Sequence, residues 1–192
     1  MARTLAFDRA EAVRRARSVF WSRGYESASV PELEAATGLS RSSIYNSFGS
    51  KRGLFDAAVD SYLEEVVRPR LEPFTREEIA ADSLQNYLTS LASKLENTNS
   101  ERLAIGCMLV NSANSTIAND KAVAGKVSSY RQELHDAFGR GLRAARPDLN
   151  FERHSLLTDT ITGLVIGAFS LVRVSPVEAS RLVKCAVELS LA

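Results

Sequence analysis

The side chains best suited to nucleic-acid binding lie in the segment RSSIYNSF at residues 41–48 and at Lys51. The planar guanidinium of Arg41 matches the O6 and N7 acceptors of guanine, a contact that is typically worth about 1–3 kcal/mol of base discrimination. The Tyr45 hydroxyl and the Lys51 ammonium suit phosphate oxygens. Ser29 is also expected to contact a phosphate. Four other residues suit either phosphates or bases: Ser42, Ser43, Asn46 and Ser47. The alternative for each residue is a solvated position on a small helical bundle.

Turn and capping signals place most of these side chains on the second of two short helices. Ser29 and Glu32 have the spacing of a capping box, in which each side chain accepts a hydrogen bond from the other residue's backbone N–H. Gly38 can adopt the left-handed conformation that ends this first helix, and Ser40 can cap a second helix that begins at Arg41. The result is a helix-turn-helix at about residues 29–48. Three apolar residues are expected to face inward: Leu39, Ile44 and Phe48.

Charge alone gives only a weak indication of the partner. The 192 residues carry a net charge of +1. Residues 1–56 contain nine Lys or Arg against six Asp or Glu, a net charge of +3, and residues 57–192 contain fifteen against seventeen, a net charge of −2. A basic first quarter is compatible with phosphate binding, although the surface helices of ordinary proteins often look the same.

Other features indicate a cytoplasmic protein without a metal, cofactor or membrane contact. Cys107 and Cys185 form no CxxC pair, which argues against structural zinc and a redox dithiol. His135 and His154 have no neighbouring ligand at metal-binding spacing. The N-terminus lacks a signal-peptide pattern, and the longest apolar stretch, residues 161–174, is shorter than the about 20 residues that span a bilayer.

Helical periodicity runs through nearly the whole chain, and no segment shows the strict alternation of a strand. We therefore expect an all-α fold. Beyond the helix-turn-helix, helices are expected at residues 8–22, 51–67, 75–96, 103–113, 121–145, 152–173 and 176–189. Pro69 and Pro73 are expected to end the helix at residues 51–67 and to mark a boundary between domains.

Further residues extend the helix-turn-helix pattern in both directions: Phe20, Gly24-Tyr25, the helix capped by Ser29, Thr37-Gly38-Leu39-Ser40, Ile44-Tyr45, Phe48, Ser50-Lys51 and Leu54-Phe55. Over about residues 8–56 this order resembles the DNA-binding domain of TetR-family repressors. The resemblance implies a homodimeric, all-helical repressor. It also implies a three-helix DNA-binding domain at residues 1–56 and a larger domain at residues 57–192 for dimerisation and ligand sensing.

Carried over by position, the resemblance implies DNA contacts at Ser29, Arg41, Ser42, Ser43, Tyr45, Asn46, Ser47 and Lys51. The chain departs from the family at two of these positions. Ser42 stands where the family often has glycine or proline, and Ser47 stands where histidine or tyrosine is common. One phosphate contact and the local base preference therefore stay open.

Eight residues are candidates for contact with an unidentified small-molecule effector. The segment GCMLVN at residues 106–111 is similar to a pattern found in some family members where a short helix joins the two domains, which suggests Cys107, Met108 and Asn111. Five others suit an apolar cavity with a few polar groups: Tyr62, Tyr87, Tyr130, His135 and Phe138. The alternative is that Asn111 is bonded locally and the others pack in the core.

The segment at residues 161–174 is apolar on nearly every side, so both of its faces must be covered. Gly163 and Gly167 would let another helix approach closely. With the last helix, this segment suits the four-helix dimer interface that the resemblance implies. The candidate interface residues are Gly163, Leu164, Gly167, Phe169, Leu182, Val183 and Ala186. The alternative is a central helix buried in a monomer.

The expected function is a DNA-binding transcriptional regulator, most simply a repressor that a small molecule releases from its operator. Its expected partners are a double-stranded DNA operator, a second copy of the chain and the effector. One competing hypothesis is a hydrolase that uses Cys107 with His135, but the chain has no nucleophile elbow, HExxH motif or glycine-rich phosphate loop. Another is a helical adaptor that binds proteins and has no ligand response.

Overall fold

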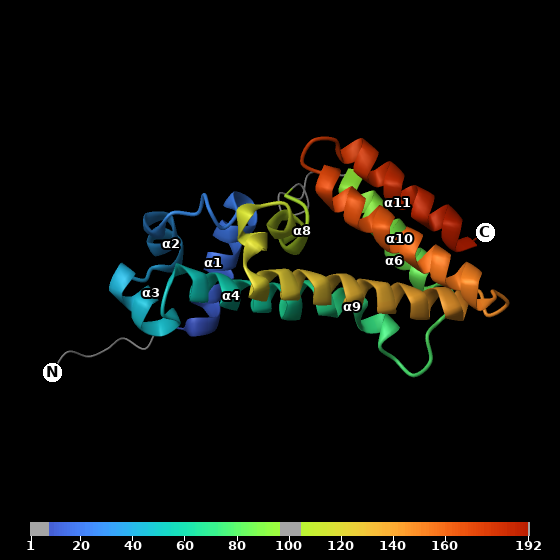
Figure 1. The fold of residues 1–192 in the computed structure, drawn as a ribbon, viewed down its shortest axis with the longest axis horizontal. Helices are drawn as coiled ribbons and strands as arrows, with labels where there is room; N and C mark the ends of the chain where they lie inside the picture. The colour runs from blue at the N-terminus through green and yellow to red at the C-terminus, as the bar shows by residue number, and fades with distance from the viewer. Residues whose placement is uncertain (1–7, 97–104, 192) are drawn as a thin grey trace.

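The computed structural model of the chain describes residues 8–96 and 105–191, and every regular element in these ranges is a helix. The expected all-α class is therefore confirmed. The longer helices are α1 (Arg9–Arg23), α2 (Val30–Thr37), α3 (Arg41–Phe48), α4 (Lys51–Tyr62), α6 (Ser83–Glu96), α8 (Met108–Ala113), α9 (Lys121–Ala145), α10 (Phe151–Leu171) and α11 (Pro176–Leu191). Figure 1 shows α1 to α4 gathered at one end, α6, α10 and α11 grouped at the other, and α9 running lengthwise.

The caps expected around α2 and α3 are present. The Ser29 N–H donates to the Glu32 carboxylate at 2.9 Å, and the Glu32 N–H donates to the Ser29 hydroxyl at 3.3 Å. Gly38 ends α2 with a left-handed φ of 72°, and the Ser40 side chain caps α3. Because each cap satisfies backbone groups that helix ends leave unpaired, the two helices begin and end where the residues indicate.

Aromatic side chains of α1 and α4 hold the helix-turn-helix in place. Phe20 packs edge-on against Phe55 with ring centroids 5.2 Å apart, and Tyr25 packs on the same ring. Farther along the two helices, Trp21 packs edge-on against Tyr62 at 4.9 Å. Edge-to-face pairs of this kind stabilise a core by about 0.5–1.5 kcal/mol beyond the area that they bury. They give α3 a rigid support.

The helix that begins at Lys51 does not end at Val67, so this part of the sequence prediction is wrong. It continues as a π-helical segment (Leu63–Val67), α5 (Arg68–Leu71) and a 3-10 turn (Glu72–Phe74). Pro69 lies in the first turn of α5, where a missing N–H costs little because the hydrogen-bonding pattern changes there. Pro73 likewise lies in the first turn of the 3-10 segment. We call residues 51–74 the α4–α5 rod.

Two other boundaries differ from the sequence prediction. Residues 75–82 are turns and irregular backbone rather than helix, and α6 begins at Ser83. Ile79 is the half-buried apolar residue of the charged stretch before it, so little packing favours a helix there. Residues 105–107 are not helical either, because Gly106 has a φ of 74°. Residues 103 and 104 of the predicted helix lie outside the described residues.

The α9 helix spans the predicted residues 121–145, and α10 and α11 lie within two residues of their predicted bounds. α6 and α10 each pack against α11, and α9 packs on α10. Among the described helices, α10 is long and apolar enough to cross a membrane by length and composition. Core helices of water-soluble proteins meet the same criterion, and 39% of that apolar window is buried within this subunit.

Four contacts join the helix-turn-helix end to the other helices. The Trp21 indole N–H donates to the Gly106 carbonyl at 2.8 Å in a buried contact, and the Arg173 guanidinium donates to the Trp21 carbonyl. The Glu26 carboxylate accepts the Ile117 N–H at 2.7 Å, and the Arg52 guanidinium donates to the Asp120 carboxylate at 2.9 Å. The position of α3 is therefore linked to that of α8 to α10.

Candidate nucleic-acid interface and cavity

The α3 helix presents a polar face to solvent. Ile44 is buried beneath it, and Arg41, Ser42, Tyr45 and Asn46 are exposed. Three other predicted DNA contacts are less exposed: Ser43, Ser47 and Lys51 are half-buried. Helical periodicity explains this division, because the residues on one side of α3 must cover α4.

The Arg41 side chain lies over the Tyr45 ring, with its guanidinium carbon 5.5 Å from the ring centroid. This cation–π contact is worth about 0.5–1 kcal/mol at an exposed site and holds the two side chains together. Glu34 of α2 accepts the Arg41 backbone N–H at 2.5 Å. The positive end of α3 therefore already has a carboxylate partner. Nothing in the sequence spacing had indicated Glu34, because it meets Arg41 only across the turn.

The serines of α3 are engaged locally. The Ser40 hydroxyl lies 2.9 Å from both the Ser42 and the Ser43 hydroxyls, and it also accepts the Ser43 N–H. Ser29 is likewise bonded within its capping box through both its hydroxyl and its N–H. Because each hydroxyl can both donate and accept, these side chains keep capacity for an outside partner.

Lys51 is the most firmly held of the candidate phosphate ligands. Its ammonium lies 4.6 Å from the Tyr25 ring centroid and donates to the Glu26 carbonyl at 3.4 Å. Burial lowers the pKa of Lys51, and the Glu26 and Glu32 carboxylates act in the opposite direction. The group lies at the N-terminal end of α4, where backbone N–H groups also favour an anion.

Comparisons with known proteins support this interpretation of α2 and α3. The family model of bacterial regulatory proteins of the tetR family matches residues 12–58. The chain is 37% identical over 150 residues to YezE of Bacillus subtilis, an uncharacterised HTH-type transcriptional regulator, and the match covers 76% of this chain and 74% of YezE. This chain belongs to the TetR family.

Two further relatives of this TetR-family regulator were found. The HTH-type transcriptional repressor ComR of Escherichia coli is 28% identical over 128 residues, which cover 66% of this chain and 60% of ComR. A cysteine mutant of the TetR-family regulator CifR, solved with a 26-base-pair operator DNA, is 28% identical with a TM-score of 0.79. That match covers 97% of this chain and 98% of the CifR chain. The protein is thus a transcriptional regulator and not an enzyme.

The C-terminal half of this TetR-family protein buries most of the predicted effector contacts. Cys107 is fully buried, and its thiol donates to the Tyr130 hydroxyl at 3.3 Å. Burial raises the pKa of the Tyr62 and Tyr130 hydroxyls well above the ordinary value, and the neighbouring Cys107 acts in the same direction. Cys107 is therefore paired with a tyrosine rather than with His135 as the hydrolase hypothesis requires.

Three other candidates serve the fold. Met108 and Phe138 are buried in the core, and the Asn111 amide donates to the Ile105 carbonyl at 2.8 Å. His135 lies 3.5 Å from the carboxylates of both Asp136 and Asp159. Within residues 8–96 and 105–191, no group of three or more potential metal-ligating side chains comes together.

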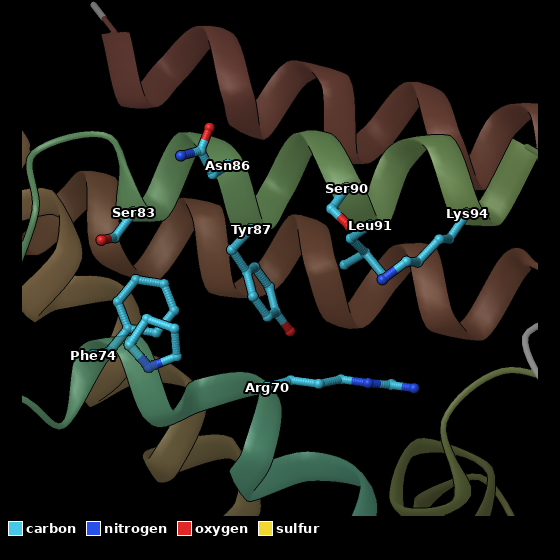
Figure 2. A pocket seen from close by; sticks show the side chains of 9 residues that line it. Arg70, Phe74, Ser83, Asn86, Tyr87, Ser90, Leu91 and Lys94 are labelled. Carbon is cyan, nitrogen blue, oxygen red and sulfur yellow. The ribbon is translucent and has the colours of Figure 1, made fainter.

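A cavity of about 340 Å³ opens between the end of the α4–α5 rod and α6, and we call it the α5–α6 cavity (Figure 2). Of the eight effector candidates, Tyr87 lines this cavity and the other seven do not. Its full lining is Arg70, Pro73, Phe74, Ser83, Asn86, Tyr87, Ser90, Leu91 and Lys94. Sequence periodicity could not identify these residues, because they meet only where two separate helices pack face to face.

The predicted interface residues of α10 and α11 fall into two groups. Gly163 is exposed, and Leu164, Gly167 and Leu182 are half-buried. By contrast, Phe169, Val183 and Ala186 are buried in the subunit's own core. These three pack where α10 and α11 meet each other and α6, so they contribute to the subunit core. A role for them in a dimer interface stays a prediction. Six large apolar side chains of α10, α11 and their connection remain exposed: Phe151, Leu156, Leu171, Val174, Val177 and Leu191.

Proposed function

We propose that this TetR-family regulator is a repressor that binds a double-stranded DNA operator as a homodimer and is released by a small-molecule effector. The observation that carries the proposal is the exposed face of α3, on which Arg41 and Tyr45 lie together above a buried Ile44. CifR was solved with operator DNA, and ComR is named as a repressor. Binding to chromosomal DNA would place the protein in the cytoplasm.

The proposed DNA contacts divide by chemistry. Arg41 reads a base edge in the major groove. Phosphates are bound by Tyr45, Lys51 and Ser29. Ser42, Ser43, Asn46 and Ser47 line the same helix and complete the contact surface. Ser42 and Ser43 each contact the Ser40 hydroxyl and keep capacity for a further hydrogen bond to DNA.

Exposed apolar surface on α10 and α11 supports the homodimer. Phe151 and Val174 are 80% and 84% exposed, and an apolar surface of this kind is commonly covered by another protein. Gly163 has open space above its α-carbon, so a partner helix can approach closely there. In a two-fold dimer the two α3 helices would meet successive major grooves about 34–36 Å apart.

Effector release requires a site whose occupancy changes the domain arrangement, and the α5–α6 cavity is our candidate. It lies at the end of the α4–α5 rod that begins beside α3. A ligand that favours an arrangement with a different α3 spacing weakens operator binding, and by linkage the operator weakens ligand binding by the same factor.

The DNA proposal is tested by fluorescence anisotropy of the full-length protein against the DNA upstream of its own gene. We expect Arg41→Ala to weaken specific binding about 5- to 150-fold, which corresponds to about 1–3 kcal/mol, with little change on unrelated DNA. Arg76→Ala is the matched control, because Arg76 is an exposed arginine that pairs with Glu72 far from α3. An Arg41→Ala, Tyr45→Ala double variant with unchanged affinity would sink the proposed interface.

A further inference from the structure

The lining of the α5–α6 cavity contains two cations and no carboxylate. Arg70 reaches in from α5, and Lys94 reaches in from α6 on the opposite wall (Figure 2). Buried Phe74 and Leu91 supply apolar surface, and Tyr87 lies between the basic and aromatic parts. This combination of apolar walls and a few convergent polar groups is typical of small-molecule sites.

Arg70 and Lys94 have no anionic partner among the described residues. The interactions of Arg70 are electrostatic ones with the Tyr62 and Tyr87 hydroxyls, and Lys94 forms no ion pair in residues 8–96 and 105–191. Within residues 8–96 and 105–191, most arginines are bonded to a carboxylate or a carbonyl, and Arg70 is an exception. Two cations that face one cavity repel each other unless an anion neutralises them.

A neighbouring cavity provides a contrast within the same subunit. It lies on another side of Phe74, between the α4–α5 rod and α9, and has a volume of about 550 Å³. Arg68 pairs there with Glu64 and Glu133, and Arg140 donates to the Arg76 carbonyl. The lining also contains the carboxylates of Glu64, Glu72, Glu133 and Asp136. A lining with cations and no carboxylate therefore distinguishes the α5–α6 cavity from this neighbouring one.

We propose that the α5–α6 cavity binds a small organic anion whose carboxylate or phosphate group lies between Arg70 and Lys94 and whose apolar body lies against Phe74 and Leu91. This inference rests on the proposed effector response and adds the chemical class of the ligand. The Tyr87 hydroxyl can donate to the same anion. Burial raises the pKa of Tyr87 to about 12, so the hydroxyl keeps its proton at neutral pH.

The cavity volume limits the size of the ligand. At about 340 Å³ it is roughly twice the ~150 Å³ cavity that holds a benzene molecule, so it suits one or two rings or a short alkyl chain. Ser83 and Asn86 line the side of the cavity that Figure 2 shows away from Lys94, and they can bond to a polar group at the far end of the ligand.

The test is isothermal titration of the full-length protein without DNA at constant ionic strength. The probes are phenylacetate, phenyl phosphate and octanoate, and the neutral control is phenylacetamide. We expect at least one anion to bind at least about tenfold more tightly than the amide, since hydrogen bonds to charged groups are the stronger kind. Preference for phenylacetate over phenyl phosphate identifies a carboxylate ligand, and the reverse preference identifies a phosphate ester. If no anion binds more tightly than the amide, the inference is wrong.

Variants then locate the bound anion. Arg70→Gln and Lys94→Gln should each lower the affinity for the anion about tenfold or more. Both side chains are exposed, so the fold should tolerate either change. Lys121→Gln removes the same charge from an exposed position outside the cavity and should leave the affinity unchanged. Two results would place the anion elsewhere and overturn the inference. One is a parent-like affinity in the Arg70→Gln, Lys94→Gln double variant, and the other is a loss of affinity in Lys121→Gln as large as in the cavity variants.

A second readout separates this inference from the proposed function. Operator binding is followed by anisotropy as the same anion is added. Binding of the anion in the cavity without release of DNA supports the ligand class and contradicts the effector role. Normal operator binding by a protein that binds no anion contradicts the ligand class and leaves the DNA-binding function standing.

Discussion

At the residue scale, local partners decide what each polar side chain of α3 can offer to DNA. The Glu34 carboxylate accepts a hydrogen bond from the Arg41 backbone N–H and not from the Arg41 guanidinium, so the guanidinium stays exposed. Ser42 and Ser43 share one hydroxyl partner, and Lys51 is held against Tyr25. The arginine is thus suited to reading a base, and the lysine is suited to a fixed phosphate contact.

Lys51 provides the residue-scale prediction. Loss of one phosphate contact releases one fewer set of counterions, so Lys51→Gln should reduce the slope of log affinity against log salt by about 0.9. It should weaken specific and non-specific binding alike, as measured by anisotropy between about 50 and 200 mM salt. Lys184→Gln, which removes an exposed lysine from α11, is the control. An unchanged slope with lower stability would show that Lys51 supports only the fold.

At the element scale, the turn between α2 and α3 depends on backbone conformation more than on packing. Gly38 has a φ of 72°, and a β-carbon added there would meet no atom within 4 Å. Gly125 in the second turn of α9 has the same open surroundings but lies in a regular helix. The two glycines therefore differ in backbone conformation and not in the room available for a β-carbon.

We expect opposite effects when each of these glycines becomes alanine. Gly38→Ala should lower the free energy of unfolding by about 1–2 kcal/mol, because a β-carbon disfavours the left-handed conformation. Gly125→Ala should raise it by about 0.5–1 kcal/mol, because alanine restricts the unfolded chain and favours helix. Urea denaturation of both variants measures the difference. Changes of the same sign would mean that conformation at residue 38 does not limit the turn.

At the scale of the whole molecule, the ion pair of Arg52 with Asp120 joins α4 to the start of α9. The hydrogen bond from Arg52 is the main reason that the pKa of Asp120 lies well below its usual range. A carboxyl group with a lowered pKa stabilises the fold above its unfolded pKa of about 3.9, and this contribution is lost as the pH falls toward the folded value.

The pH dependence can be isolated with Asp120→Asn, since asparagine can still cap α9. We expect this variant to be less stable than the parent at about pH 7 and pH 5 by the same amount. The difference should shrink at about pH 3, where the unfolded carboxyl is protonated and the parent loses the advantage. Chemical denaturation at each pH measures it. A difference that does not change with pH would exclude the ion pair as its cause.

The proposed homodimer gives a second prediction at this scale. Gly163→Phe places a large ring where the subunit leaves open space, so it should preserve the helical fold and prevent association. Gly125→Phe adds the same ring to an exposed position on α9 and should leave association unchanged. Light scattering after size-exclusion chromatography measures the mass. A dimeric Gly163→Phe protein would rule out this part of α10 as the interface.

Much of the helical framework could be predicted from local patterns. Ser29, Gly38 and Ser40 set the ends of α2 and α3 through contacts between residues a few positions apart, and α9 follows its apolar periodicity over its full length. The predictions failed where local signals were weak or ambiguous. Pro69 indicated a helix end but fits the first turn of α5, and residues 75–82 lack a buried stripe that would sustain a helix.

The sequence by itself determined that this chain is helical, where its helix-turn-helix begins and ends, and which side of α3 is polar, because these depend on neighbours within about four residues. Only the tertiary structure decided which apolar side of α11 is used inside the subunit and that Glu34 meets Arg41. It also decided that Arg70 and Lys94 face one cavity. These contacts join residues on different helices, and their geometry depends on how whole helices pack.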